Sequence, residues 1–166
     1  KLAFCPNALE GLRLLKSRSN FKIIVASNQA GVARGFYSVI RMFEVNTHIK
    51  KALSSNGIEL DRWYCCPFVD KEYAQQKNIS PDNPWIKETR FRKPKIGMLE
   101  QAKKDFDLDF SKCWMIGDSV TDVQAGRRAG CRTIHVLTGT EKDIIPYSPD
   151  FTTKNMVEAA EYILNS

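Results

Sequence analysis

The sequence predicts an α/β protein with a doubly wound parallel sheet between two layers of helices, a three-layer α/β/α arrangement. Short apolar runs alternate along the chain with longer segments whose apolar residues recur at helical spacing. The clearest run, residues 113–116, leads into Gly117-Asp118, and no helix breaker follows until Gly126. This is the pattern of strand, tight turn and helix. Because ligands of such sheets bind beyond the carboxyl ends of the strands, Asp118 is expected at the mouth of a site.

The remaining elements follow from spacing and composition. Helices are expected over residues 7–18, 38–55, 96–105, 119–129 and 155–164. Strands are expected over residues 21–26, 61–68, 113–116 and 132–137. In the second helix, one apolar stripe is assigned to the core, and its members are Met42, Val45, Ile49 and Leu53. Residues 67–92 are polar, contain Pro81 and Pro84 and lack periodicity, so an irregular loop insertion is expected in an otherwise single domain.

The composition narrows the class of protein and its partners. Hydrophobic residues at 43% and charged residues at 27% are typical of a soluble globular protein. No apolar run approaches the ~20 residues of a membrane span, and the five scattered cysteines favour a reducing cytoplasm over a disulfide framework. The net charge of +6 favours an anionic partner without choosing between nucleic acid and a phosphorylated metabolite. Of the possible assembly states, a monomer is favoured.

Two groups of polar residues are candidates for a site. Asp118 and Asp122 stand one helical turn apart beside a helix N-terminus, which suits a Mg²⁺ ion that carries a phosphate. The simpler alternative is that Asp118 only caps the helix. After the strand at 21–26, residues 27–35 form a loop rich in small and polar residues. It could wrap an oxyanion with backbone N–H groups and the Ser27 hydroxyl, with Arg34 available for a phosphate or sugar; a turn with a polar rim is an equal alternative.

Three motifs in this order resemble those of the haloacid dehalogenase (HAD) superfamily of phosphatases and its Rossmann-like fold. Ser27 matches the hydroxyl motif of that family, Lys93 its lysine, and Gly117-Asp118 with Asp122 its acidic motif. Residues 27–35 and 92–99 are similar to the branch that contains D-glycero-D-manno-heptose 1,7-bisphosphate phosphatase and histidinol-phosphate phosphatase. The resemblance covers most of the chain, and three motifs in register make the capping explanation for Asp118 much weaker.

The resemblance implies a role for each matching residue. Asp118 would coordinate Mg²⁺, and Asp122 would hold the water shell of the metal or the lysine. Ser27 would hydrogen-bond the phosphoryl group during transfer, while Lys93 would pair with its charge. Three further residues would contact the sugar or phosphate of the substrate: Asn28, Arg34 and Arg92. Phosphoryl transfer needs this kind of positioning and charge neutralisation, which a lysine, a hydroxyl and Mg²⁺ supply.

The implied activity is that of a Mg²⁺-dependent phosphomonoesterase that works through an aspartyl-phosphate intermediate. Heptose bisphosphate is the leading substrate, and histidinol phosphate is the second. A DNA 3′-phosphatase is a third alternative, although nucleic acid is disfavoured because the aromatic residues are not interleaved with the basic ones. The alternative from another class is a catalytically inactive module for phosphosugar binding or assembly.

Zinc is not expected, because the sequence departs from the heptose branch at its structural zinc site. That branch commonly carries Cys-Pro-His and Cys-x-Cys, where this chain has residues 66–68, Cys-Pro-Phe, and residues 89–91, Thr-Arg-Phe. Cys66 alone cannot form a tetrahedral site. The insertion is therefore expected to be held by packing of Phe68, Trp85 and Phe91, or to be mobile.

The second departure concerns the nucleophile. The family carries an Asp-x-Asp motif on a first, central strand that lies between the strands of Ala26 and Ile116. Here no Asp-x-Asp follows an apolar strand: the Asp-x-Asp at residues 107–109 stands in a polar stretch between a helix and a strand. Without the central strand, two rows of backbone groups would be unpaired, at several kcal/mol for each buried group. We therefore expect roughly 20–30 residues before Lys1 that contain this strand, with an inactive relative as the alternative.

Overall fold

The computed structural model describes residues 3–18, 20–139 and 148–166. Among these residues, every strand and helix that the sequence predicts is present, together with one further strand and one further short helix. The strands are β1 (Ile24–Asn28), β2 (Arg62–Cys66), β3 (Trp114–Gly117), β4 (Arg132–Val136) and β5 (Phe151–Thr153). The helices are α1 (Ala8–Arg18), α2 (Val39–Ser54), α3 (Lys71–Gln76), α4 (Gly97–Phe106), α5 (Val120–Ala129) and α6 (Met156–Leu164), with a 3₁₀ turn, η1, at Phe110–Lys112.

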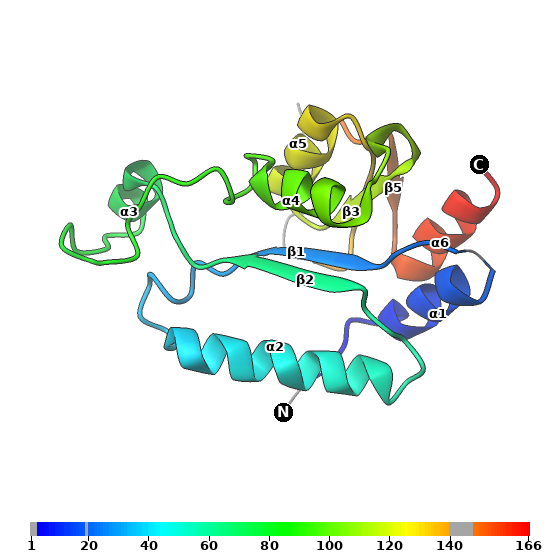
Figure 1. Ribbon diagram of the computed structural model, residues 1–166, viewed down its shortest axis with the longest axis horizontal. Helices are drawn as coiled ribbons and strands as arrows, with labels where there is room; N and C mark the ends of the chain where they lie inside the picture. The colour runs from blue at the N-terminus through cyan, green and yellow to red at the C-terminus, as the bar shows by residue number, and fades with distance from the viewer. Residues whose placement is uncertain (1–2, 19, 140–147) are drawn as a thin grey trace.

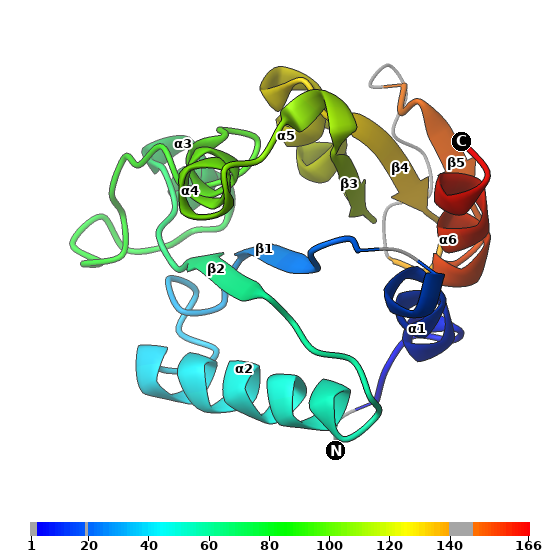
Figure 2. The ribbon, with the colours of Figure 1, turned by 45° about the vertical axis from the view of Figure 1, so that its right-hand side comes forward.

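The strands form two parallel sheets whose free edges face each other. β1 pairs with β2, and β3, β4 and β5 pair in that order. Both views place β1 between β2 and β3 (Figures 1 and 2). Among the residues that the structure describes, no strand pairs with the edge of β1 that faces β3. This arrangement agrees with a doubly wound sheet in which a central strand belongs between β1 and β3.

Helices cover the strands from two sides, which confirms the predicted α/β class. α4 and α5 lie on one side of the strands, and α1 and α2 lie on the other (Figure 1). α1 packs against α6 through a cluster that includes Leu15, Ile134 and Ile163. A second cluster, with Leu53 and Ile58, joins the end of α2 to the start of β1. Within the described ranges, no helix has both the length and the apolar character needed to cross a bilayer.

Residues 67–92 are more regular than the sequence predicted. α3 begins after Asp70, whose carboxylate accepts a backbone N–H from the first turn of the helix at 2.7 Å. The segment returns through a parallel bridge between Val69 and Ile86. The predicted packing of Phe68 on Trp85 is present, with ring centroids 5.4 Å apart. A helix of this length is too short to show a helical period, so periodicity alone could not reveal it.

Two further predictions need correction. β1 extends to residue 28, so Ser27 and Asn28 belong to the strand rather than to the loop after it. In α2, Val45 is 41% exposed, whereas Met42 is 2% exposed, so the predicted stripe is only partly core. The buried side of the helix also includes Asn46. Positions 42, 46, 49 and 53 lie on one helical face, and position 45 falls at its edge.

Candidate functional site

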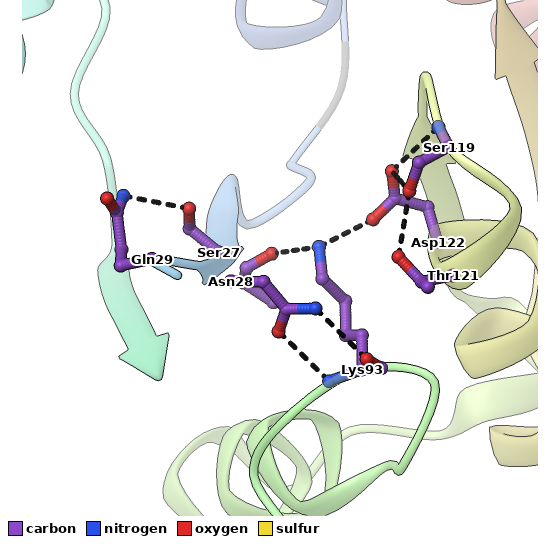
Figure 3. Close-up of polar contacts among 8 residues, drawn as sticks. Ser27, Asn28, Gln29, Lys93, Ser119, Thr121 and Asp122 are labelled. Carbon is purple, nitrogen blue, oxygen red and sulfur yellow. Dashed lines mark hydrogen bonds and ion pairs between the residues drawn. The ribbon is translucent and has the colours of Figure 1, made fainter. Parts of the chain in front are cut away.

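Lys93 is the centre of a polar cluster between the two sheets. Its side chain is only 8% exposed. Its Nζ donates to the carbonyl oxygen of Ala26 in β1 and to Oδ1 of Asp122 in α5, each at 2.5 Å (Figure 3). A lone buried ammonium would be costly, and these two acceptors offset much of that cost. Lys93 therefore joins the carboxyl-terminal part of β1 to the first turn of α5.

Asn28 holds the backbone of Lys93 in this position. The Asn28 Oδ1 accepts the Lys93 backbone N–H, and the Asn28 Nδ2 donates to the Lys93 carbonyl, both at 3.0 Å (Figure 3). The amide thus forms a reciprocal pair with one residue of the 92–95 turn. The predicted contact between Asn28 and the substrate stays a prediction, because the amide keeps a second N–H proton and a second oxygen lone pair beyond these two hydrogen bonds.

The two carboxylate oxygens of Asp122 accept hydrogen bonds from two residues, Lys93 and Ser119. Besides the contact with Lys93, its Oδ2 accepts the Ser119 backbone N–H at 3.1 Å and the Ser119 hydroxyl at 3.0 Å (Figure 3). Ser119 is the N-cap of α5, and the pair forms a capping box. Of the two predicted roles of Asp122, holding the lysine agrees with this geometry. The other predicted role, holding the water shell of Mg²⁺, stays a prediction.

Asp118 lies at the carboxyl end of β3 and does not cap the helix, because Ser119 takes that position. Gly139 packs against its side chain: a Cβ atom built on Gly139 would lie 1.9 Å from Oδ2 of Asp118. His135, which is 1% exposed, contacts the Asp118 carbonyl oxygen through Nε2 at 3.3 Å. In the part of the chain that the structure describes, no hydrogen bond or ion pair engages the Asp118 carboxylate. Its coordination of Mg²⁺ stays a prediction.

Ser27 takes part in a chain of hydrogen bonds that the sequence did not predict. Its Oγ accepts a hydrogen bond from Nε2 of Gln29 at 3.0 Å (Figure 3). Oε1 of the same amide accepts a hydrogen bond from the Tyr37 hydroxyl at 2.9 Å. The amide next to the hydroxyl motif was the available signal for Gln29. Tyr37 gave none, because only the folded loop brings it to Gln29.

The two predicted substrate-binding arginines have partners outside this cluster. Arg34 is exposed, and its guanidinium lies over the Phe36 ring, 4.2 Å from the centroid. Arg92 lies over the Tyr73 ring at 4.5 Å and donates to the Phe68 carbonyl at 3.4 Å. Their contacts with a substrate stay predictions. The structure brings the other predicted residues to the carboxyl ends of β1 and β3: Ser27, Asn28, Lys93, Asp118 and Asp122.

The donor set fits Mg²⁺ better than it fits a metal held by the protein alone. The described residues contain no group of three or more His, Cys, Asp or Glu side chains placed around a metal. Mg²⁺ needs no such group, because it keeps several waters and binds one or two carboxylates together with substrate phosphate. Asp118, beside the N-terminus of α5, can supply one such carboxylate. At Cys66, burial raises the pKa of the thiol, and the expected absence of zinc stays a prediction.

Comparison with known proteins identifies the family. The HAD-hydrolase-like family profile matches residues 90–159. A D-glycero-D-manno-heptose-1,7-bisphosphate 7-phosphatase of Thermosynechococcus vestitus is 32% identical, over 98% of this chain and 83% of that protein. The chain belongs to the HAD-like hydrolases. A D-glycero-alpha-D-manno-heptose-1,7-bisphosphate 7-phosphatase of Campylobacter jejuni is 33% identical to this HAD-like hydrolase, over 84% of this chain and 70% of that protein.

The fold of this HAD-like hydrolase is also similar to that of a solved structure. The crystal structure of a D,D-heptose 1,7-bisphosphate phosphatase from B. bronchiseptica, complexed with magnesium and phosphate, matches it with a TM-score of 0.75. The two chains are 25% identical, and the match covers 96% of this chain and 83% of the other. These findings confirm the family and fold class that the three motifs predicted.

Proposed function

We propose that this HAD-like hydrolase is a Mg²⁺-dependent phosphatase that removes a phosphate from D-glycero-D-manno-heptose 1,7-bisphosphate. The observation that carries the proposal is the buried Lys93 ammonium, tied to β1 beside Ser27 and to the first turn of the helix that follows Asp118. The names of the relatives support the substrate, and the magnesium and phosphate in the B. bronchiseptica structure support the metal and the reaction class.

Each residue has a distinct task in this proposal. The Ser27 hydroxyl donates to a phosphoryl oxygen, and the Lys93 ammonium balances the negative charge that the group carries. Asn28 keeps Lys93 in place through the two backbone hydrogen bonds. Mg²⁺ bound at Asp118 would neutralise charge on the phosphoryl oxygens. The 2.5 Å contact with Asp122 fixes the direction of the Lys93 side chain before a substrate arrives.

We place the aspartate nucleophile on a further strand between β1 and β3, as the resemblance to the family implies. The two free edges that face each other support this placement, since a parallel strand there would join the sheets into one. Its carboxyl end would then lie beside Ser27 of β1 and Asp118 of β3, where the phosphoryl group is held. Proton transfer to the leaving group would come from the second aspartate of the same motif.

The test is a phosphate-release assay on the full-length protein with three substrates: heptose bisphosphate, histidinol phosphate and a 3′-phosphorylated oligonucleotide. Heptose bisphosphate should be hydrolysed with the highest kcat/KM, and EDTA should abolish the activity. Asp118→Asn should lower kcat/KM by about 100-fold or more, the usual effect of removing a group that stabilises transition-state charge. Asp107→Asn is the matched control, because this exposed residue ends α4 in a left-handed conformation that Asn tolerates.

Three outcomes would contradict the proposal in different ways. Equal release of phosphate in EDTA would exclude the role of Mg²⁺. Preference for histidinol phosphate or for the oligonucleotide would exclude the proposed substrate, but the protein would still be a phosphatase. Binding of heptose bisphosphate without release from any substrate would favour the non-catalytic phosphosugar-binding module.

A further inference from the structure

We infer that Gln29 and Tyr37 are positioning residues that orient the Ser27 hydroxyl toward the phosphoryl group. The inference rests on the proposed function in one respect, that Ser27 donates a hydrogen bond to phosphate. The Tyr37 hydroxyl donates to Oε1 of Gln29 at 2.9 Å, and Nε2 of Gln29 donates to Oγ of Ser27 at 3.0 Å. Both hydrogen bonds are therefore donated in the direction of Ser27, and the serine oxygen is the last acceptor.

The direction of these bonds decides where the serine proton points. A serine hydroxyl has one proton to donate and can accept through its lone pairs. Because Ser27 accepts from Gln29, its own O–H is not used on that side and can turn to another acceptor. If the amide were reversed, its oxygen would face Ser27 and would take the serine proton. Ser27 would then present only oxygen lone pairs to the anionic phosphate, and these would repel the phosphate.

Tyr37 determines which end of the amide faces Ser27. The amide of Gln29 has an acceptor end and a donor end, so a donor at Oε1 leaves the NH₂ group for the serine. A phenol is a better donor than acceptor, because its oxygen lone pair is delocalised into the ring. The Tyr37 hydroxyl therefore stabilises the orientation in which Gln29 donates to Ser27.

The loop between β1 and α2 is shaped to admit the tyrosine. A Cβ atom built on Gly31 would lie 2.4 Å from Cζ of Tyr37 and 2.5 Å from its hydroxyl oxygen. The loop closes through the Phe36 backbone N–H, which donates to the Gly31 carbonyl at 2.9 Å. Tyr37 directly precedes Ser38, the N-cap of α2, so its ring is fixed to the beginning of a 16-residue helix. Loop and helix thus hold the donor in place.

Two substitutions change the direction of the bonds without removing Ser27. Gln29→Glu keeps the shape of the side chain, but an ionised carboxylate can only accept, so it would take the Ser27 proton. We expect kcat to fall by about 10- to 100-fold, with a smaller change in KM, by analogy with the loss of one oxyanion donor. Lowering the pH toward the usual glutamate pKa of about 4.3 should restore part of the activity relative to wild type. Tyr37→Phe should lower kcat by about 2- to 10-fold, the range for one neutral hydrogen bond.

A double-mutant cycle separates positioning from a general structural role. In a Ser27→Ala background, Gln29→Ala and Tyr37→Phe should each lower kcat by less than about 2-fold, because they act through the missing hydroxyl. Full additivity with Ser27→Ala would overturn the inference. The matched control is Tyr64→Phe, which removes the 2.6 Å bond from the Tyr64 hydroxyl to Asp105 and should leave kcat unchanged.

A binding measurement keeps this inference distinguishable from the proposed function. The affinity of the full-length protein for inorganic phosphate, with Mg²⁺ present, can be measured by calorimetry for the same variants. If phosphate binds but no substrate is hydrolysed, the proposed function fails, and the cycle in Kd decides the inference. Coupled losses of affinity at Ser27 and Gln29 would support it. No phosphate binding, or wild-type affinity in Ser27→Ala, would overturn it.

Discussion

Substitution of one partner of the Lys93–Asp122 pair should lower the free energy of unfolding more than substitution of any surface charge. Nζ and Oδ1 are 2.5 Å apart, and both side chains are 8% exposed. Loss of one partner from such a pair leaves an uncompensated buried charge and costs about 3–5 kcal/mol of unfolding free energy. That is a large share of the ~5–15 kcal/mol that stabilises a typical domain.

The structure predicts an order for the two single substitutions. Lys93→Met leaves Asp122 with the two hydrogen bonds from Ser119, so the loss should lie near 3 kcal/mol, the lower end of the range of about 3–5. Asp122→Leu leaves the buried ammonium without its carboxylate partner and also removes the capping box, so the loss should approach about 5 kcal/mol. The double variant should lose less than the sum of the two.

The assay is urea unfolding of the full-length protein, followed by circular dichroism. The matched control is Lys95→Met, which breaks a pair of nearly the same length: Lys95 Nζ to Glu88 Oε2 is 2.6 Å, with side chains 48% and 64% exposed. It should cost less than about 1 kcal/mol. If Lys93→Met cost no more than Lys95→Met, the reasoning that burial makes the Lys93 pair essential would be refuted.

Two further predictions follow from local geometry. Gly139→Ala places a methyl group against the Asp118 carboxylate, so the Mg²⁺ concentration for half-maximal activity should rise about 10-fold or more, since small misplacements are costly at such sites; an unchanged Mg²⁺ requirement would contradict the contact. At Asp61, burial raises the pKa, but hydrogen bonds from Ile23 and Lys16 outweigh it and lower the pKa below 3.8. The stability that this residue contributes is therefore present above that pH and lost as the pH falls through the lower folded-state pKa. Asp61→Asn should reduce the acid-induced loss of stability measured by thermal unfolding. An unchanged dependence of the unfolding temperature on pH would argue against this role of Asp61.

The parts of the fold that the sequence predicted well are those in which one element carries a complete local signal. The apolar run at 113–116, the turn at Gly117 and the stop at Gly130 predicted β3 and α5 to within a few residues. α3 and β5 were missed, because six and three residues are too few to show a period. Val45 was misassigned since helical spacing gives the face of a helix but not the width of its buried part.

For the site, residue type predicted which positions matter, but not what each one touches. Lys93 and Asp122 stand 29 positions apart, and only the fold shows that they form one buried pair. Asn28 was expected to contact the substrate because the family resemblance implied that role, and nothing in the sequence indicated a contact with Lys93. In the folded protein, the turn brings the Lys93 backbone within hydrogen-bonding distance of the Asn28 amide. Contacts between loops depend on tertiary packing, which no local pattern contains.

The contact between Lys93 and the Ala26 carbonyl has a consequence for how the site becomes active. A parallel strand beside β1 would present its own amides to backbone acceptors of β1, and the Ala26 oxygen that Lys93 contacts would be one of them. Docking of such a peptide would displace the ammonium from the main chain and leave it with Asp122 alone. Completion of the sheet and release of a positive charge for incoming phosphate would then be a single event.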